Sequence, residues 1–83
     1  MIMRTEYRDE LKDRLLNLPD PAVIGMGSDP NLTVPTLLAD DALMERLWSV
    51  YQKDIEDYDV DPDYALVDAC HEILGIPEER FLP

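Results

Sequence analysis

The sequence predicts a small all-α protein: a bundle of three main helices with one or two short helical turns. Two observations predict this class. Apolar residues recur at helical spacing in three segments, and capping residues or prolines bound these segments. No pair of segments has the pattern of partner strands. With 83 residues, the chain is long enough for one domain, residues 1–83, with one core.

The first main helix is predicted over about residues 5–17, within TEYRDELKDRLLNLP. Its apolar stripe has a four-residue spacing: Tyr7, Leu11 and Leu15. Thr5 is placed to cap the N-terminus, and Glu10 and Arg14 are spaced as an i,i+4 ion pair. Pro19 ends the helix, because the residue before a proline is pushed out of the helical conformation.

Residues 19–39 are predicted to be irregular, since they hold four of the seven prolines and two of the three glycines. Asp20-Pro21 favours one short helical turn that a following glycine ends. A short extended piece is the alternative at this place. A second short turn is expected after Pro35.

The second main helix is predicted over about residues 41–56, with Asp40 or Asp41 as its cap. Its apolar positions follow an i, i+3/i+4, i+7 pattern: Leu43, Met44, Leu47, Trp48, Tyr51 and Ile55. We therefore expect Trp48 to be a core residue.

The third main helix is predicted over about residues 62–74, with Asp61 as N-cap. Gly75 is expected to stop it in the left-handed conformation, with Ile76 packing back on the core. One more turn is expected at residues 77–81, followed by an apolar tail of Phe81 and Leu82.

The segment DYDVDPDYALVD, residues 57–68, has aspartates at a spacing close to that of an EF-hand calcium loop. The sixth position of such a loop needs glycine for a sharp turn, and here it is Pro62. Asp68 is also shorter than the glutamate that closes the loop. We interpret Asp61 and Asp63 as a helix start, and a calcium-responsive module remains the weaker alternative.

The net charge of −12 is unevenly distributed. Residues 1–53 hold nine acidic side chains against six basic ones, whereas residues 54–83 hold ten acidic side chains against Arg80 alone. Binding of nucleic-acid phosphates requires clustered Lys and Arg, so we expect no direct contact with nucleic acid.

The window DIEDYDVDPD carries six acids in ten residues. If it is extended, alternate carboxylates share a face at about 6.6 Å spacing, on the order of the step between phosphates of one DNA strand. Such like-charge neighbours are mildly destabilising. Because the charge imbalance is concentrated in one third of the chain, we interpret the acids as a contact surface for a basic partner, and a solvated face is the alternative. The expected partner-binding residues are Asp54, Glu56, Asp57, Tyr58, Asp59, Asp63, Tyr64, Asp68 and Glu72.

Residue types used in catalysis are few. Cys70 and His71 are neighbours on a helix, where side chains point about 100° apart, so they cannot form a nucleophile–base pair. Zinc-ligand spacing and the lysine of a phosphate-binding loop are missing, and the carboxylates look solvated. We expect no enzymatic activity, no metal and no cofactor, with Cys70 as a reduced core thiol.

No apolar run approaches the roughly 20 residues of a membrane span, and the start MIMRTEYRDELK lacks the apolar segment of a signal peptide. We therefore expect a cytoplasmic protein that does not bind membranes.

The leading functional hypothesis is a small acidic inhibitor that covers a basic, nucleic-acid-binding surface of a partner protein. In size and charge the chain is similar to phage anti-defence inhibitors (anti-CRISPR or anti-restriction proteins), antitoxins and nuclease immunity proteins, with which it shares no motif. The alternative is a structural or accessory subunit whose acidity serves solubility or high-salt adaptation. Such a subunit would dock through an apolar patch of Val23, Ile24, Met26 and Leu32.

Overall fold

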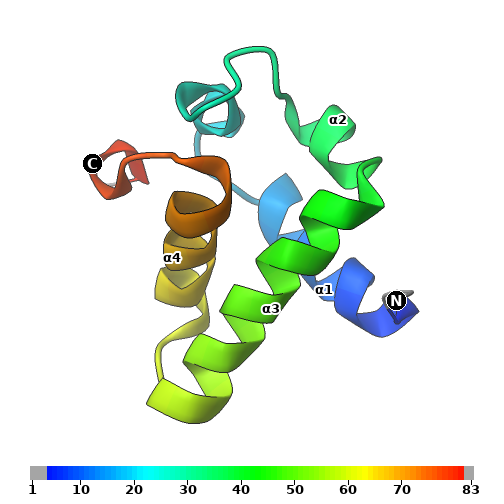
Figure 1. Ribbon diagram of the computed structural model, residues 1–83, viewed down its shortest axis with the longest axis vertical. Helices are drawn as coiled ribbons and strands as arrows, with labels where there is room; N and C mark the ends of the chain where they lie inside the picture. Colours follow the sequence, from blue (N-terminus) through cyan, green and yellow to red (C-terminus); the bar gives the residue numbers. More distant parts are fainter. Residues whose placement is uncertain (1–3, 82–83) are drawn as a thin grey trace.

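The structure is a computed structural model that describes residues 4–81, and it confirms the all-α class (Figure 1). The elements in chain order are α1 (Thr5–Leu16), the 3-10 helix η1 (Pro21–Met26), α2 (Val34–Leu38), α3 (Asp41–Tyr58), α4 (Pro62–Leu74) and the 3-10 helix η2 (Glu78–Phe81). Within residues 4–81 there is no strand. The predicted tail residue Leu82 lies outside the described residues. No helix of the described part is both long and apolar enough to span a bilayer.

The helices α3 and α4 form a hairpin whose turn lies at the bottom of Figure 1, and α1 crosses behind α3. Two ion pairs connect α1 to this hairpin. Arg8 pairs with Asp41 at the start of α3, and Arg14 reaches Asp63 at the start of α4. Charged side chains of α1 therefore tie both ends of the hairpin to the first helix.

Most predicted helix caps are present. The Asp40 carboxylate accepts a hydrogen bond from the Leu43 N–H at 3.1 Å, and Asp61 accepts one from the Asp63 N–H at 3.2 Å. The predicted cap at Thr5 is wrong, because Thr5 is already helical and Arg4 occupies the N-cap position without a side-chain hydrogen bond. A residue inside the first turn cannot fold its hydroxyl back over that turn.

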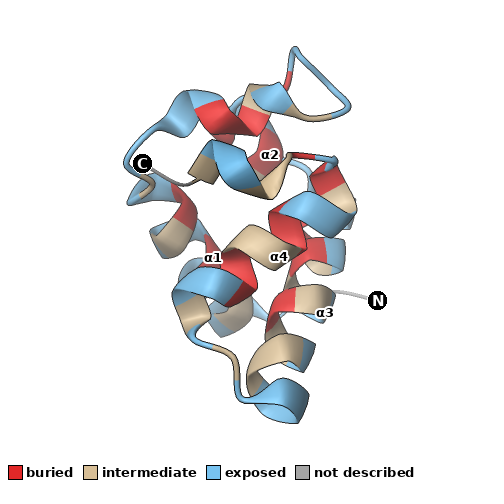
Figure 2. Cartoon of the chain, turned by 90° about the vertical axis from the view of Figure 1, so that its left-hand side faces the viewer, coloured by how far each residue is buried: buried red, intermediate tan, exposed pale blue. Residues whose placement is uncertain are grey.

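The core lies between α1, α3 and α4 and is closed at one end by η1 and α2, as the buried surfaces in Figure 2 show. The largest fully buried side chains are Leu11, Leu15, Ile24, Leu37, Met44, Leu47, Tyr51, Cys70 and Ile76. Trp48 is only partly buried, so the prediction of a core residue holds in part. Its ring stacks on Tyr7 with 4.4 Å between centroids and lies 5.3 Å from Tyr51.

The prediction of an exposed apolar docking patch in the irregular segment is wrong. Val23, Ile24 and Leu32 are 2%, 1% and 7% exposed, so they belong to the core of this chain. Met26 alone of the four is exposed, at 43%. The short helix η1, which Asp20 caps, turns these side chains inward.

The end of α4 is fixed by Gly75, which adopts the predicted left-handed conformation with φ 72°. The next residue, Ile76, is fully buried, and the Ser28 N–H donates to the Leu74 carbonyl at 2.9 Å. The loop after η1 is therefore hydrogen-bonded to the last turn of α4.

Candidate functional site

The turn of the α3–α4 hairpin does not contain the extended row of aspartates that the sequence suggested. Asp57 lies inside α3, which continues to Tyr58, two residues beyond its predicted end. Asp59 then adopts a left-handed conformation with φ 52° and ψ 40°, which turns the chain toward α4. The Val60 N–H closes the helix by donating to the Asp54 carbonyl at 3.1 Å. Aspartate visits this conformation more readily than most residues, so the helix can end here without glycine.

The hairpin brings together acids that are far apart in sequence. Asp54 on α3 and Asp68 and Glu72 on α4 line one shallow hollow, together with Lys53 and Tyr58. The pKa of Asp54 is raised to about 6, first by a hydrogen bond with the Asp68 side chain, then by partial burial, and then by the charges of Asp68 and Glu72. Lys53 opposes this shift. The expectation that the acids are fully solvated is therefore wrong for Asp54.

Two predicted aromatic residues are exposed beside these acids. Tyr58 is 65% exposed and lines the hollow, and Tyr64 is 53% exposed. Tyr64 precedes Asp68 by four residues, so both lie on the same face of α4. The remaining acids near the turn are exposed: Glu56, Asp57 and Asp59.

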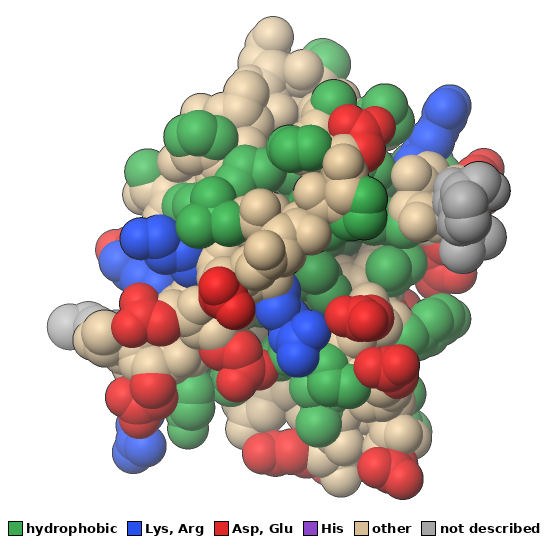
Figure 3. All heavy atoms as spheres, turned by 180° about the vertical axis from the view of Figure 1, so that it is seen from behind, with side chains coloured by type: hydrophobic (Ala, Val, Ile, Leu, Met, Phe, Trp, Pro, Cys, Tyr) green, Lys and Arg blue, Asp and Glu red, His purple; other side chains and the backbone are tan. Residues whose placement is uncertain are grey.

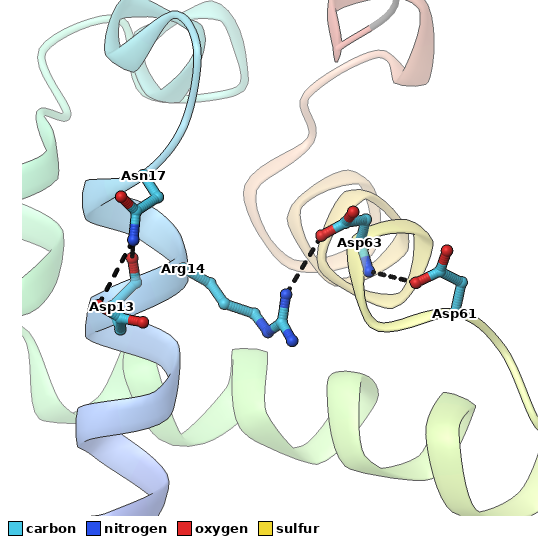
Figure 4. Close-up of polar contacts among 5 residues, drawn as sticks. All are labelled: Asp13, Arg14, Asn17, Asp61 and Asp63. Carbon is cyan, nitrogen blue, oxygen red and sulfur yellow. Dashed lines mark hydrogen bonds and ion pairs between the residues drawn. The ribbon is translucent and has the colours of Figure 1, made fainter.

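Asp63 differs from the other predicted site residues. The Arg14 guanidinium approaches one carboxylate oxygen of Asp63 at 3.2 Å, and Figure 4 shows this side chain extending from α1 to α4. The predicted Glu10–Arg14 ion pair does not form, because Arg14 points across the helix interface instead. We use the name acidic hairpin for the other residues of the predicted contact surface: Asp54, Glu56, Asp57, Tyr58, Asp59, Tyr64, Asp68 and Glu72.

The space-filling view from behind shows how charge is distributed on one face of the molecule (Figure 3). Asp and Glu side chains lie mainly over the lower half of this face, whereas its upper half is mostly hydrophobic or uncharged. Negative charge is therefore unevenly distributed over this face.

A second feature was not predicted from the sequence. A cavity of about 780 Å³ opens between α1, α3, α4 and η2, and Glu10, Arg14, Tyr51 and Asp63 are among the residues that line it. The sequence pattern assigned Tyr51 to the core without a polar role. A general rule could have indicated a polar role for Tyr51, because a buried tyrosine hydroxyl usually needs a hydrogen-bond partner.

Cys70 and His71 are adjacent in sequence but lie in different environments. Cys70 is fully buried with a free thiol, and burial raises its pKa to about 12. His71 is exposed, and its Nδ1 lies 3.0 Å from the Ile76 carbonyl oxygen. Among residues 4–81, no cluster of three or more His, Cys, Asp or Glu side chains has the geometry of a metal site.

Comparisons with models of protein families, with curated proteins and with solved structures find no match to this chain. The binding properties of the acidic hairpin therefore follow from the chemistry of its own side chains. Clustered carboxylates accept hydrogen bonds from Lys and Arg, and the exposed tyrosine rings can pack against the same cations.

Proposed function

We propose that this protein uses the acidic hairpin to bind a basic surface of another protein and so prevents that surface from binding nucleic acid. The observation that carries the proposal is the cluster of Asp54, Asp68 and Glu72, which the fold holds in one hollow. Among the described residues lining that hollow, Lys53 is the only cation.

Like charges held together in this way are unfavourable in the free protein. A guanidinium or ammonium group of a partner would donate hydrogen bonds to these carboxylates, neutralise part of their charge and so relieve their repulsion. Tyr58 and Tyr64 supply large exposed rings beside the carboxylates, and tyrosine is among the residues enriched at the centres of binding interfaces. The combination is suited to a partner rich in Arg and Lys.

The proposed mechanism is competition without catalysis. The carboxylates would pair with Arg and Lys side chains that otherwise hold phosphates, and the net charge of −12 would attract a basic partner and raise the association rate. The proposal includes a cytoplasmic location, in keeping with the reduced thiol of Cys70, and no direct contact with nucleic acid or membrane.

The decisive experiment begins with capture of the partner from a cell lysate and its identification by mass spectrometry. A quadruple variant (Asp54→Asn, Glu56→Gln, Asp57→Asn and Asp59→Asn) is then compared with the wild-type protein. Asn is chosen at position 59 because it tolerates the left-handed conformation. A matched control removes four acids outside the hairpin: Glu6→Gln, Asp9→Asn, Glu45→Gln and Glu79→Gln.

We expect the hairpin variant to stay folded, to bind the partner with a lower association rate, and to lose much of its salt dependence. The control should bind like the wild type, apart from a small general effect of net charge. Salt matters because the screening length falls from roughly 10 Å at 0.1 M to 3 Å at 1 M. If the hairpin variant binds as the wild type does at both low and high salt, the proposed function is wrong.

A further inference from the structure

The cavity between α1 and the α3–α4 hairpin is separate from the acidic hollow, since the two share no lining residue. Its volume of about 780 Å³ is within the range of roughly 300–1,000 Å³ that is typical of ligand sites. Apolar side chains form a large part of its wall: Leu18, Ile55, Val67 and Phe81.

Two side chains that line the cavity have buried hydrogen-bond donors without acceptors. Tyr51 is 1% exposed, and its hydroxyl is buried with no hydrogen-bond partner among the described residues. The Nε–H of Arg14, which also lines the cavity, is buried and unpaired in the same way. Buried polar groups nearly always have a partner, so an oxygen atom from outside this chain would complete the site.

The hydroxyl of Tyr51 is held in its protonated form. Its pKa is raised to about 12, first by burial and then by the nearby Glu10 carboxylate, while Arg14 acts in the opposite direction. At neutral pH the hydroxyl therefore carries a proton that it can donate to a carbonyl oxygen.

The charged side chains that line the cavity are mainly acidic. Three carboxylates line the cavity, those of Glu10, Asp13 and Asp63, and the guanidinium of Arg14 is the one cation among the described lining residues. Because Arg14 pairs with Asp63, two exposed carboxylates, those of Glu10 and Asp13, have no ion-pair partner within residues 4–81. The cavity therefore favours a cation.

We propose that this cavity binds a lysine- or arginine-bearing segment of the partner protein, with a backbone carbonyl oxygen at Tyr51 and Arg14 and the cationic head at Glu10 and Asp13. The methylene stem of the same side chain would lie along Leu18, Ile55 and Phe81. The inference rests on the proposed function for the source of the segment, and it adds a second anchor outside the acidic hairpin.

The test uses N-acetyl-arginine N-methylamide as the probe, titrated into the full chain and followed by the shifts of backbone amide signals in NMR spectra. The matched control is N-acetyl-citrulline N-methylamide, which has the same shape without the charge. We expect the arginine probe to shift amides of residues 10–18 and of Phe81, and the citrulline probe to bind several-fold more weakly.

Two comparisons test the assigned contacts: Tyr51→Phe with the wild type, and Asp13→Asn with Asp9→Asn. Tyr51→Phe removes one hydrogen bond and should weaken probe binding about fivefold, with no loss of melting temperature, since the hydroxyl has no partner in the free protein. Asp13→Asn should weaken binding of the arginine probe, whereas Asp9→Asn, one turn earlier on α1 and outside the cavity, should not. If Tyr51→Phe fails to fold, the Asp13 and Asp9 pair decides.

Equal binding of the two probes, or undiminished binding by Tyr51→Phe, would overturn the inference. Shifts confined to the hollow of Asp54 and Asp68 would overturn it as well, while agreeing with the proposed function. The quadruple variant of the acidic hairpin leaves the cavity intact and should bind the probe like the wild type. The two proposals can therefore fail independently.

Discussion

Asp54 on α3 and Asp68 on α4 line the same hollow across the helical hairpin, and hydrogen bonding with the Asp68 side chain is the largest cause of the raised pKa of Asp54. Such a contact requires a proton on one of the two carboxyl groups. Above the pKa of about 6 that proton is lost, and two negative charges with Glu72 beside them face one another at the site. The free protein thus holds an unfavourable arrangement at neutral pH, at the place where we propose that a cation binds.

The first prediction concerns pH. The folded protein holds the proton of Asp54 with a pKa of about 6 and the unfolded chain with a pKa of 3.8, so the folded state binds more protons between these values. Raising the pH through this window lowers the contribution of Asp54 to the free energy of unfolding. Asp54→Asn should remove this loss and stabilise the protein at neutral pH by roughly 0.5–1 kcal/mol, a value reduced for solvent screening.

The measurement is urea denaturation of wild type and Asp54→Asn at several pH values. The two proteins should differ least at pH values well below 3.8, where the carboxyl group is protonated in both states. Glu56→Gln is the control, because it removes an exposed acid of the same helix that does not line the hollow with Asp68. If Glu56→Gln raises the free energy of unfolding by the same amount, the stabilisation comes from the change in net charge and not from the Asp54–Asp68 contact.

The second prediction concerns Trp48, whose ring joins α1 to α3 by stacking on Tyr7. Trp48→Ala should lower the free energy of unfolding by about 3 kcal/mol, and Trp48→Phe by less, because a ring is kept in the stack. Tyr58→Ala is the control, since that ring is 65% exposed and its loss should change stability little. An unchanged denaturation midpoint for Trp48→Ala would show that the stack does not hold α1 in place.

The third prediction concerns Gly75, which has φ 72°. Gly75→Ala should cost about 1–2 kcal/mol, because a side chain is strained in this conformation and its Cβ would overlap the Ser28 hydroxyl. The double variant Gly75→Ala/Ser28→Ala should recover the part of the cost that comes from overlap. Thermal melting measures both, and no recovery would assign the whole cost to backbone strain.

The fourth prediction concerns Asp61 as the cap of α4. Asp61→Ala should lower the free energy of unfolding by about 1 kcal/mol, and Asp61→Ser should cost much less, because serine can also accept the Asp63 N–H hydrogen bond. Asp57→Ala, which removes an exposed acid near the C-terminus of α3, should be neutral or slightly stabilising. Equal losses for Asp61→Ala and Asp61→Ser would contradict the capping role.

The sequence by itself determined the helices, because the signals that start and stop them are local. Asp40 and Asp61 each bond to an N–H within three residues, and Gly75 adopts the left-handed conformation at the residue where its helix ends. The apolar stripe of α1 also follows from spacing alone, with Leu11 and Leu15 fully buried. Such features depend on neighbours in the chain and need no knowledge of the rest of the fold.

The side chains that meet across helices were decided only by the tertiary structure. The rotation of α3 against α4 places Asp54 at Asp68, and the packing of α1 sends Arg14 to Asp63 rather than to Glu10, the partner that its spacing favoured. The same packing buries the hydroxyl of Tyr51 without a partner. Contacts between helices depend on how each helix is turned about its axis, and residue spacing within one helix does not contain that angle.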